Sequence, residues 1–220
     1  MTAPLPHAFY ARSTLAVAPD LLGKVLVHRS ADGVSAGIIV EAEAYIGMDD
    51  PACHASAGRT RRNEPLFGPP GFAYVYLNYG IHFLFNVVTE ADGHPAAVLV
   101  RALEPTEGLP LMRARRAGDR RSGAVPDHEL CKGPGALSRA MGIGLEHNRH
   151  DLRGPRLYLE DRGVRPEQVA WSPRIGISAG TDRPWRCYLP GHPSVSGTRS
   201  RGVALHLFPR STQKRRGRAG

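Results

Sequence analysis

The segment Ile38-Ile-Val-Glu-Ala-Glu-Ala-Tyr45 places two carboxylates within a run of apolar and small residues. The run predicts a strand, whose alternation puts Glu41, Glu43 and Tyr45 on one face and the two alanines on the other. A strand that only supports a fold would avoid the cost of removing acids from water. This segment therefore decides both the sheet that we expect and the place where we look for chemistry.

Turn and strand signals continue on both sides of this segment. Leu22 to His28 reads as a strand, and the turn Ala31-Asp-Gly33 leads into the strand from about Ala36 to Ala44. After a loop rich in Gly, Pro and Arg, strands are expected over 72–77, 81–89 and 97–103. Such a series of hairpins favours an antiparallel or mixed sheet over a doubly wound one.

Helical signals and short strands follow in the second half of the chain. Helices are expected over 107–116, over 128–132 with Asp127 as the cap, over 133–141, and over 165–171. Short strands are expected near 156–160, 173–178 and 185–189. We predict one domain over 1–209 and a basic disordered tail over 210–220.

The charge of the chain indicates a polyanionic partner. Lys and Arg number 29 against 20 acids, which gives +9, and only three of the cations are lysines. Arginine suits bidentate phosphate contact, although biased codon usage would give the same count. A soluble basic protein without such a partner is the alternative.

The cysteines and the apolar runs bear on location. Cys53, Cys131 and Cys187 are far apart and lack paired spacing, which argues for a reducing compartment. No apolar run approaches the length of a membrane span, and the first ten residues lack the pattern of a signal peptide. We therefore expect a cytoplasmic protein without a membrane segment.

Glu43 is the stronger catalytic candidate of the two acids, because its alanine neighbours leave room for a pocket. In that interpretation it is a general base that polarises a water molecule. The alternative is an edge strand whose acids are simply solvated. Arg101 interrupts the apolar run Val98-Leu-Val100 in the same way. We expect it to pair with an acid on a neighbouring strand, which is compatible with both groups holding a water.

The aromatic residues of Tyr74-Val-Tyr-Leu-Asn-Tyr-Gly80 divide into two kinds. Tyr74 and Tyr76 share a face with Phe72, so an aromatic core is the alternative to a binding role for at least one of them. Tyr79 lies beside Gly80 at a hairpin tip, where a ring could wedge into a base stack and hold a flipped nucleotide out. Asn86 lies among hydrophobic residues and needs a hydrogen-bond partner or a substrate.

Two loops have the composition of phosphate-binding segments, although either could be an ordinary surface loop. They are Gly58-Arg-Thr-Arg-Arg-Asn63 and Lys132-Gly-Pro-Gly135, which precedes a predicted helix. We assign DNA phosphate contacts to Arg59, Thr60, Arg61, Arg62, Lys132 and Gly133. The segment Glu146 to Asp151 contains metal-ligand residue types but no clustered cysteines, so no metal site is predicted.

Several of these segments occur in the order and with the gaps of a known family. The chain resembles the alkyladenine (3-methyladenine) DNA glycosylase family from about Leu22 to Pro193. The matching segments are Glu41-Ala-Glu-Ala-Tyr-Ile-Gly47, Asp50-Pro-Ala-Cys-His54, Tyr74 to Gly80, Asn86, Val100-Arg-Ala-Leu-Glu-Pro105 and Leu130-Cys-Lys-Gly-Pro134. The resemblance implies an α+β (mixed α/β) single compact domain with a curved, mainly antiparallel sheet, a protruding β hairpin and flanking helices.

The resemblance also implies roles for individual residues. Glu43 would activate the attacking water, and Arg101 would help to hold it. A flipped base would be enclosed by Tyr45, His54 and Tyr76. Tyr79 would fill the gap left in the duplex. Asn86 would oppose the exocyclic amine of normal guanine.

The chain departs from the family pattern at three positions. Arg61 stands where the family usually has proline, Cys53 replaces a more usual serine, and Phe85 replaces a smaller residue or methionine. The first change affects the shape of the loop, and the change at Phe85 could alter the size of the pocket.

The function we expect is that of a monofunctional DNA glycosylase without metal or cofactor. It would remove alkylated or deaminated purines (3-methyladenine, 7-methylguanine, hypoxanthine, ethenoadenine) from double-stranded DNA and leave an abasic site. The two lysines of the predicted domain, Lys24 and Lys132, lie outside the aromatic and acidic segments, which disfavours Schiff-base cleavage. We expect a monomer without an obligate protein partner. The alternatives are a non-catalytic damaged-DNA-binding protein and a hydrolase of free nucleosides.

Overall fold

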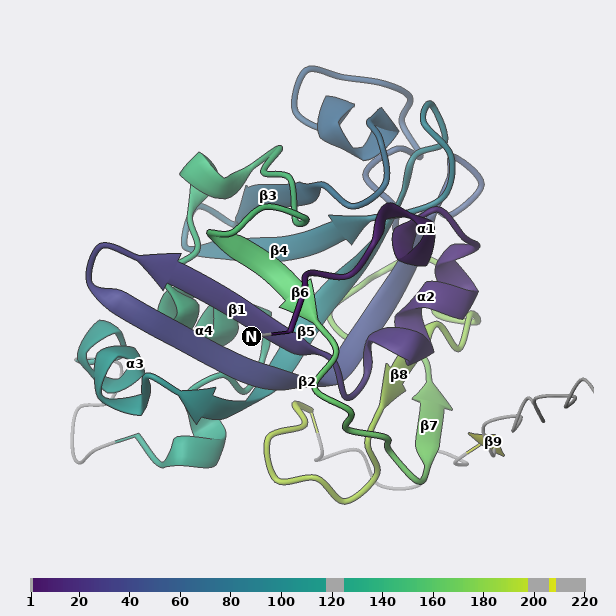
Figure 1. Cartoon of the computed structure of the whole chain (residues 1–220). Coiled ribbons are helices and arrows are strands. Elements are labelled where there is room, and N and C mark those ends of the chain that lie inside the picture. Colours follow the sequence, from purple (N-terminus) through teal and green to yellow (C-terminus); the bar gives the residue numbers. More distant parts are fainter. Residues whose placement is uncertain (1, 118–124, 198–205, 209–220) are drawn as a thin grey trace, which may run out of the picture.

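The long strand β2 (Gly33–Ile46) organises the molecule. The computed structural model describes residues 2–117, 125–197 and 206–208 (Figure 1). Its antiparallel sheet runs β3-β4-β5-β2-β8-β7-β9, and β1 pairs with both β2 and β6. The other strands are β1 (Val25–Ser30), β3 (Ala73–Asn78), β4 (His82–Val88), β5 (Ala96–Glu107), β6 (Leu157–Glu160), β7 (Val169–Ser172), β8 (Arg186–Tyr188) and β9 (His206–Phe208).

The sheet branches because β2 changes partner along one of its edges. β5 pairs with β2 from Ala36 to Ile46, whereas the other edge pairs first with β1, over residues 33–38, and then with β8, over residues 41–43. The acidic segment therefore lies at the centre of the sheet, with a strand on each side. The predicted fold, a single compact domain of helices around a curved antiparallel sheet, is confirmed.

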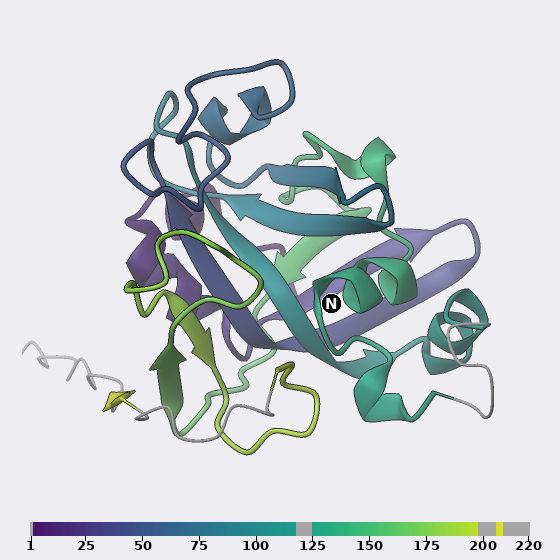
Figure 2. The same cartoon turned by 180° about the vertical axis from the view of Figure 1, so that it is seen from behind.

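Helices cover the sheet with short apolar faces. They are α1 (His7–Tyr10), α2 (Thr14–Leu21), α3 (Leu109–Arg115) and α4 (Pro134–Met141), with 3₁₀ turns η1 (Glu64–Phe67), η2 (Asp127–Glu129) and η3 (Leu145–His147). Val17 and Leu21 of α2 are fully buried, as are Leu137 and Met141 of α4. α2 packs on β2 and β5, and α4 packs on β4 and β5 (Figure 2). Among the described residues, no helix has both the length and the apolar character needed to cross a membrane.

The helix predicted over 133–141 is confirmed, and its sequence shows why it forms. Pro134 occupies the first helical position, where its missing N–H is not needed, and Gly142 ends the helix with a left-handed φ of 68°. Gly135 lets the helix approach β4, since a Cβ there would lie 2.7 Å from Cγ of His82. The start of α4 is thereby held against the β3–β4 hairpin.

Other predictions are corrected by the structure. Residues 165–171 do not form a helix, because Val169–Ser172 is strand β7, which pairs with β8. Residues 173–178 form a loop instead of a strand, and Gly176 within it has a left-handed φ of 77°, which strand backbone does not adopt. Asp127–Glu129 makes only a 3₁₀ turn, and the sequence reading did not foresee α1 and α2. The tail over 210–220 lies outside the described residues.

Candidate active site

Two β-bulges turn Arg101 toward the acidic face of β2. Ile39 pairs with Leu103 and Glu41 with Ala102, but Ala42 pairs with Val100. Val40 on one strand and Arg101 on the other therefore have no partner in register. Bulges re-aim side chains in this way next to active sites. The guanidinium of Arg101 contacts both carboxylates of the segment as a result.

Glu41 accepts four hydrogen bonds from the described residues. Its Oε1 accepts from Nε of Arg101 at 2.9 Å, from Nε of Arg186 at 2.7 Å and from Oγ of Ser196 at 2.9 Å. Its Oε2 accepts the backbone N–H of Ser196 at 2.7 Å. The side chain is fully buried, and a carboxylate offers about four acceptor positions. Glu41 thus ties β2, β5, β8 and the 194–196 segment together.

Glu43 is also fully buried but accepts fewer hydrogen bonds. Its Oε2 accepts from the hydroxyl of Tyr45 at 2.9 Å and from Nη1 of Arg101 at 3.1 Å. Its Oε1 accepts the backbone N–H of Ile175 at 2.7 Å. The alternative of a solvated edge strand is therefore wrong for both acids, and the expected pairing of Arg101 with an acid is confirmed. Among the described residues Glu43 has three donors, and its Oε1 accepts from only one of them, which leaves an acceptor position on that oxygen.

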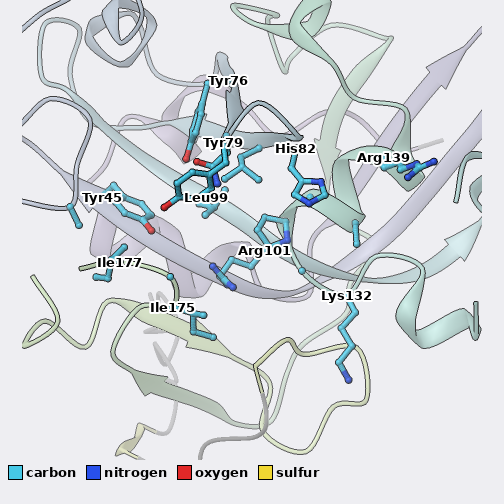
Figure 3. A pocket seen from close by; sticks show the side chains of 18 of the residues that line it. Tyr45, Tyr76, Tyr79, His82, Leu99, Arg101, Lys132, Arg139, Ile175 and Ile177 are labelled. Atoms are coloured by element: carbon cyan, nitrogen blue, oxygen red, sulfur yellow. The ribbon is translucent and has the colours of Figure 1, made fainter. Parts of the chain in front are cut away.

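The three donors to Glu43 form part of the wall of a cleft of about 720 Å³ (Figure 3). The cleft lies between the β3–β4 hairpin, the start of α4, β5 and the 175–177 loop. Its lining is aromatic and basic and, among the described residues, contains no Asp or Glu. It includes Tyr45, His54, Tyr76, Tyr79, His82, Arg101, Arg116, Lys132, Gly133, Arg139, Ile175 and Ile177. Glu43 lies directly behind this wall, and the positive lining favours an anionic ligand.

Flat rings gather on one side of the cleft. The rings of His54 and Tyr76 lie 4.4 Å apart between centroids, and Tyr74 lies 5.2 Å from Tyr76. Tyr74 is buried and exchanges a 2.8 Å hydrogen bond with Nδ1 of His54, so the expected core role applies to Tyr74. Tyr76 and Tyr45 are only half-buried and face the cleft.

The environment keeps these rings uncharged near neutral pH. Burial, helped by the nearby charge of Glu43, raises the pKa of Tyr76 to about 12, although Arg62 opposes this. Burial and then Glu43 also raise the pKa of Tyr45. Burial, followed by the charge of Arg62, lowers the pKa of His54. Neutral rings are the form that stacks on a nucleobase.

The stability of the protein should fall in alkali because of these phenols. A tyrosine whose folded pKa is raised stabilises the fold fully below the unfolded pKa of about 10, and this contribution is lost as pH rises through the folded value. We expect the free energy of unfolding to fall by about 1.4 kcal/mol per pH unit for each such tyrosine between about pH 10 and 12. Urea unfolding at several pH values measures the slope. Tyr45→Phe should make it shallower, and an unchanged slope in that variant would contradict the assignment.

Tyr79 lies at the rim of the cleft and is 87% exposed. Its φ of 49° and that of Gly80, 71°, make the tight left-handed turn between β3 and β4. Ile81 beside it is 72% exposed. A tyrosine held in a disfavoured conformation with its ring in solvent is costly unless the ring has something to contact.

Asn86 does not line this cleft. It is buried, its Nδ2 donates to the carbonyl of Tyr74 at 3.1 Å, and it faces a separate cavity of about 30 Å³ behind Tyr45, His54 and Tyr76. Cys53 lines the same small cavity. Phe85 is fully buried in the main hydrophobic core and lines neither cavity, so the prediction that it sets the size of the pocket has no support in this geometry.

The predicted phosphate contacts separate into two groups. Lys132 and Gly133 line the cleft, and Nζ of Lys132 donates to the carbonyl of Pro193 at 2.8 Å. The four residues from Arg59 to Arg62 do not line it. Arg59 pairs with Glu64, and Nη2 of Arg62 donates to the carbonyl of Leu77. Thr60 forms a turn with Asn63, and Arg61 is exposed.

Sequence reasoning missed part of the site. Ile175, Arg186 and Ser196 were not singled out, although they complete the hydrogen bonding of the two acids. The available signal for the loop of Ile175 was Gly176, because a glycine inside a short strand weakens it. In the part of the chain that the structure describes, no group of three or more His, Cys, Asp or Glu is arranged to hold a metal.

A buried acid behind a cleft of aromatic rings and cations suits an enzyme that acts on a flat base carried by a polyanion. Residues 8–193 match the family described as Methylpurine-DNA glycosylase (MPG). The chain belongs to this family and is a DNA N-glycosylase, a hydrolase of DNA repair. The family resemblance found in the sequence is thereby confirmed.

Similar proteins support this conclusion over almost the whole chain. Those from Chlorobaculum tepidum, Burkholderia lata and Rhodopseudomonas palustris strain HaA2 are 45%, 48% and 49% identical to it. The aligned parts cover 86%, 88% and 88% of this chain and 89%, 91% and 90% of those proteins. Each carries the name "Putative 3-methyladenine DNA glycosylase".

Proposed function

We propose that this protein flips alkylated purines out of double-stranded DNA and hydrolyses their N-glycosidic bond with a water molecule activated by Glu43. The observation that carries the proposal is the difference between the two acids of β2. Among the described residues, Glu41 accepts four hydrogen bonds and only one of its donor residues, Arg101, lines the cleft, whereas Glu43 accepts three and all of its donors line the cleft. A carboxylate so placed has room for a single water at the wall of the cleft.

The surroundings of Glu43 suit the charge changes of the reaction. Hydrolysis of an N-glycosidic bond passes through an oxocarbenium-like state, which a nearby carboxylate stabilises. The water would attack C1′ from the face opposite the departing base. Burial alone would disfavour the charged guanidinium of Arg101, but Glu43 and Glu41 raise its pKa above the ordinary value. Arg101 therefore stays charged and orients the carboxylate and the water.

The aromatic side of the cleft would bind the flipped base. Tyr45, His54 and Tyr76 supply neutral rings, and alkylated purines such as 3-methyladenine and 7-methylguanine carry positive charge, which favours contact with ring faces. The names of the similar proteins support the same substrate class. Hypoxanthine and ethenoadenine are neutral and would need protonation by a donor. The amide of Asn86, behind these rings, would oppose the exocyclic amine of guanine.

The basic lining would hold the DNA backbone. Lys132 and Gly133 offer an ammonium and a backbone amide at the start of α4, and Arg116 and Arg139 line the same cleft. The exposed Arg61 and its neighbours would contact phosphates further along the duplex. Tyr79 would occupy the gap that the flipped nucleotide leaves.

Base release from defined duplexes tests this function. Duplexes carrying a methylated, a deaminated or an etheno purine are incubated with the protein, and the free base is measured beside an undamaged duplex and the corresponding free nucleoside. We expect release from the methylated duplex and none from the undamaged one. Binding without release, or release from the nucleoside alone, would overturn the proposal.

Tyr79→Ala is expected to weaken lesion binding without harming the fold. The ring is exposed, so its loss removes no core packing, while stacking on a base is worth about 1–3 kcal/mol. We expect affinity for a lesion duplex to fall about 5- to 150-fold, measured by fluorescence anisotropy. Leu145→Ala is the control, because Leu145 is exposed but does not line the cleft. Equal affinities of the two variants would remove Tyr79 from the flipping step.

A further inference from the structure

A buried ion pair lies beneath the cleft and has no part in the roles assigned so far. The side chains of Arg174 and Asp50 are both fully shielded from solvent. Nη1 of Arg174 donates to Oδ2 of Asp50 at 2.6 Å, and Nη2 donates to Oδ1 at 2.7 Å. Nη1 also donates to the carbonyl of Ala44 at 3.0 Å. The two terminal nitrogens of the Arg174 guanidinium, which we call its fork, thus join the end of β2, the loop after β2 and the loop after β7.

The same guanidinium packs on an aromatic ring of the site. It lies 4.6 Å from the centroid of Tyr45 and 5.2 Å from that of Trp185. The hydroxyl of Tyr45 is the donor to Oε2 of Glu43. Arg174 therefore fixes the plane of the ring whose hydroxyl holds this carboxylate.

The second connection runs through the backbone. Ile175, the residue after Arg174, donates its N–H to Oε1 of Glu43 at 2.7 Å. Ile175, Gly176 and Ile177 form one wall of the cleft. Anchoring Arg174 therefore fixes both the amide that holds Glu43 and the wall that a flipped nucleotide would contact.

We propose that Arg174, held by Asp50, is a positioning residue for catalysis, because two of the three donors to Glu43 depend on its placement. Arg174 does not line the cleft and touches no reacting atom. The inference rests on the proposed role of Glu43 and adds to it the device that holds this carboxylate in place. A buried ion pair contributes little net stability compared with apolar residues, so a role in geometry explains its presence better.

The ionisation of Asp50 agrees with this role. Burial alone would raise the pKa of Asp50, but the hydrogen bonds and charge of Arg174 lower it below the ordinary value. Hydrogen bonds from the backbone N–H groups of Ala52 and Ile46 act in the same direction. The carboxylate stays charged and keeps both bonds of the fork.

The test uses a double variant that leaves no unpaired buried charge, Asp50→Asn with Arg174→Gln. Excision of a methylated purine is measured in a single turnover with enzyme in excess, where the first-order rate constant does not depend on the folded fraction. We expect the rate constant to fall about 10²-fold, the typical cost of a misplacement of about 1 Å, and lesion affinity to change little. Arg174→Lys keeps the charge but loses the paired hydrogen bonds of the guanidinium, so we expect a smaller loss of rate. This variant replaces the double variant in the test if the double variant does not fold.

A matched control and a double-mutant cycle separate positioning from mere support of the fold. Arg183 also lies near Asp50, at 4.0 Å, and over Trp185, but contacts neither Tyr45 nor Glu43 among the described residues, so Arg183→Gln should keep the wild-type rate. In a Tyr45→Phe background the loss caused by Arg174→Lys should shrink, since the hydroxyl that it positions is absent.

Two results would overturn the inference: a rate near that of the wild type in both Arg174 variants, or fully additive losses in the cycle. Glu43→Gln in the same assay tests the proposed function separately. If that variant is inactive while the Arg174 variants are fully active, only the positioning role fails. If Glu43→Gln keeps its activity, the proposed function fails first.

Discussion

Glu43→Gln is expected to bind a lesion duplex with affinity close to that of the wild type while excising the base about 10²- to 10⁴-fold more slowly. Glutamine keeps the size and planar shape of the side chain but cannot take a proton from water or balance positive charge on the sugar. One end of the amide becomes a donor, although both oxygens of Glu43 now accept hydrogen bonds. The chemical step should therefore fail while the cleft that binds DNA persists.

Single-turnover excision and equilibrium binding, measured on the same methylated duplex, check this expectation. Glu104→Gln is the control, because Glu104 is an exposed acid on β5, the strand that carries Arg101. The control changes the net charge by the same amount and should excise at the wild-type rate. Near-normal excision by Glu43→Gln would remove this residue from the mechanism, whatever its effect on stability.

Strand periodicity accounts for the part of the site that the sequence could predict. Alternation placed Glu41, Glu43 and Tyr45 on one face, and Arg101 of β5 does contact both acids. The hairpin tip at Tyr79 was also predictable, since Gly80 marks the turn. These features depend on neighbours a few residues apart, which is the range over which sequence patterns are informative.

Long-range partners account for what could not be predicted. The sequence shows two similar acids. They are distinguished by distant partners, Arg186 and Ser196 for Glu41 and Ile175 for Glu43. The bulge at Arg101 is a property of the register between two strands, and single-strand patterns do not contain it. The loop of Ile175 was predicted as a strand because its apolar residues resemble one. Its hydrogen bond to Glu43 arises only in the folded chain.

Glu41→Gln is expected to cause a large loss of stability, whereas the main effect expected of Glu43→Gln is on the rate of excision. Glu41 is fully buried and accepts hydrogen bonds from Arg101, Arg186 and Ser196. Removing one partner from a buried ionic cluster leaves the other charges uncompensated and typically costs about 3–5 kcal/mol. We expect the free energy of unfolding to fall by about this amount, because among the described residues Arg186 would lose its carboxylate partner and Arg101 would keep only Glu43. Urea unfolding, with an unchanged dependence on denaturant, measures the loss.

Glu43→Gln is the matched comparison, since it removes the same charge from the same face of the same strand. In that variant Arg101 keeps its contact with Glu41, and Arg186 keeps all of its contacts, so the loss of stability should be smaller. The two substitutions should therefore differ in their effects. Glu41→Gln should lower the free energy of unfolding more, and Glu43→Gln should lower the rate of excision more. If Glu41→Gln had the same urea midpoint of unfolding as the wild type while Glu43→Gln had a much lower midpoint, Glu43 would be the structural anchor of the sheet. That outcome would contradict the structural role assigned to Glu41.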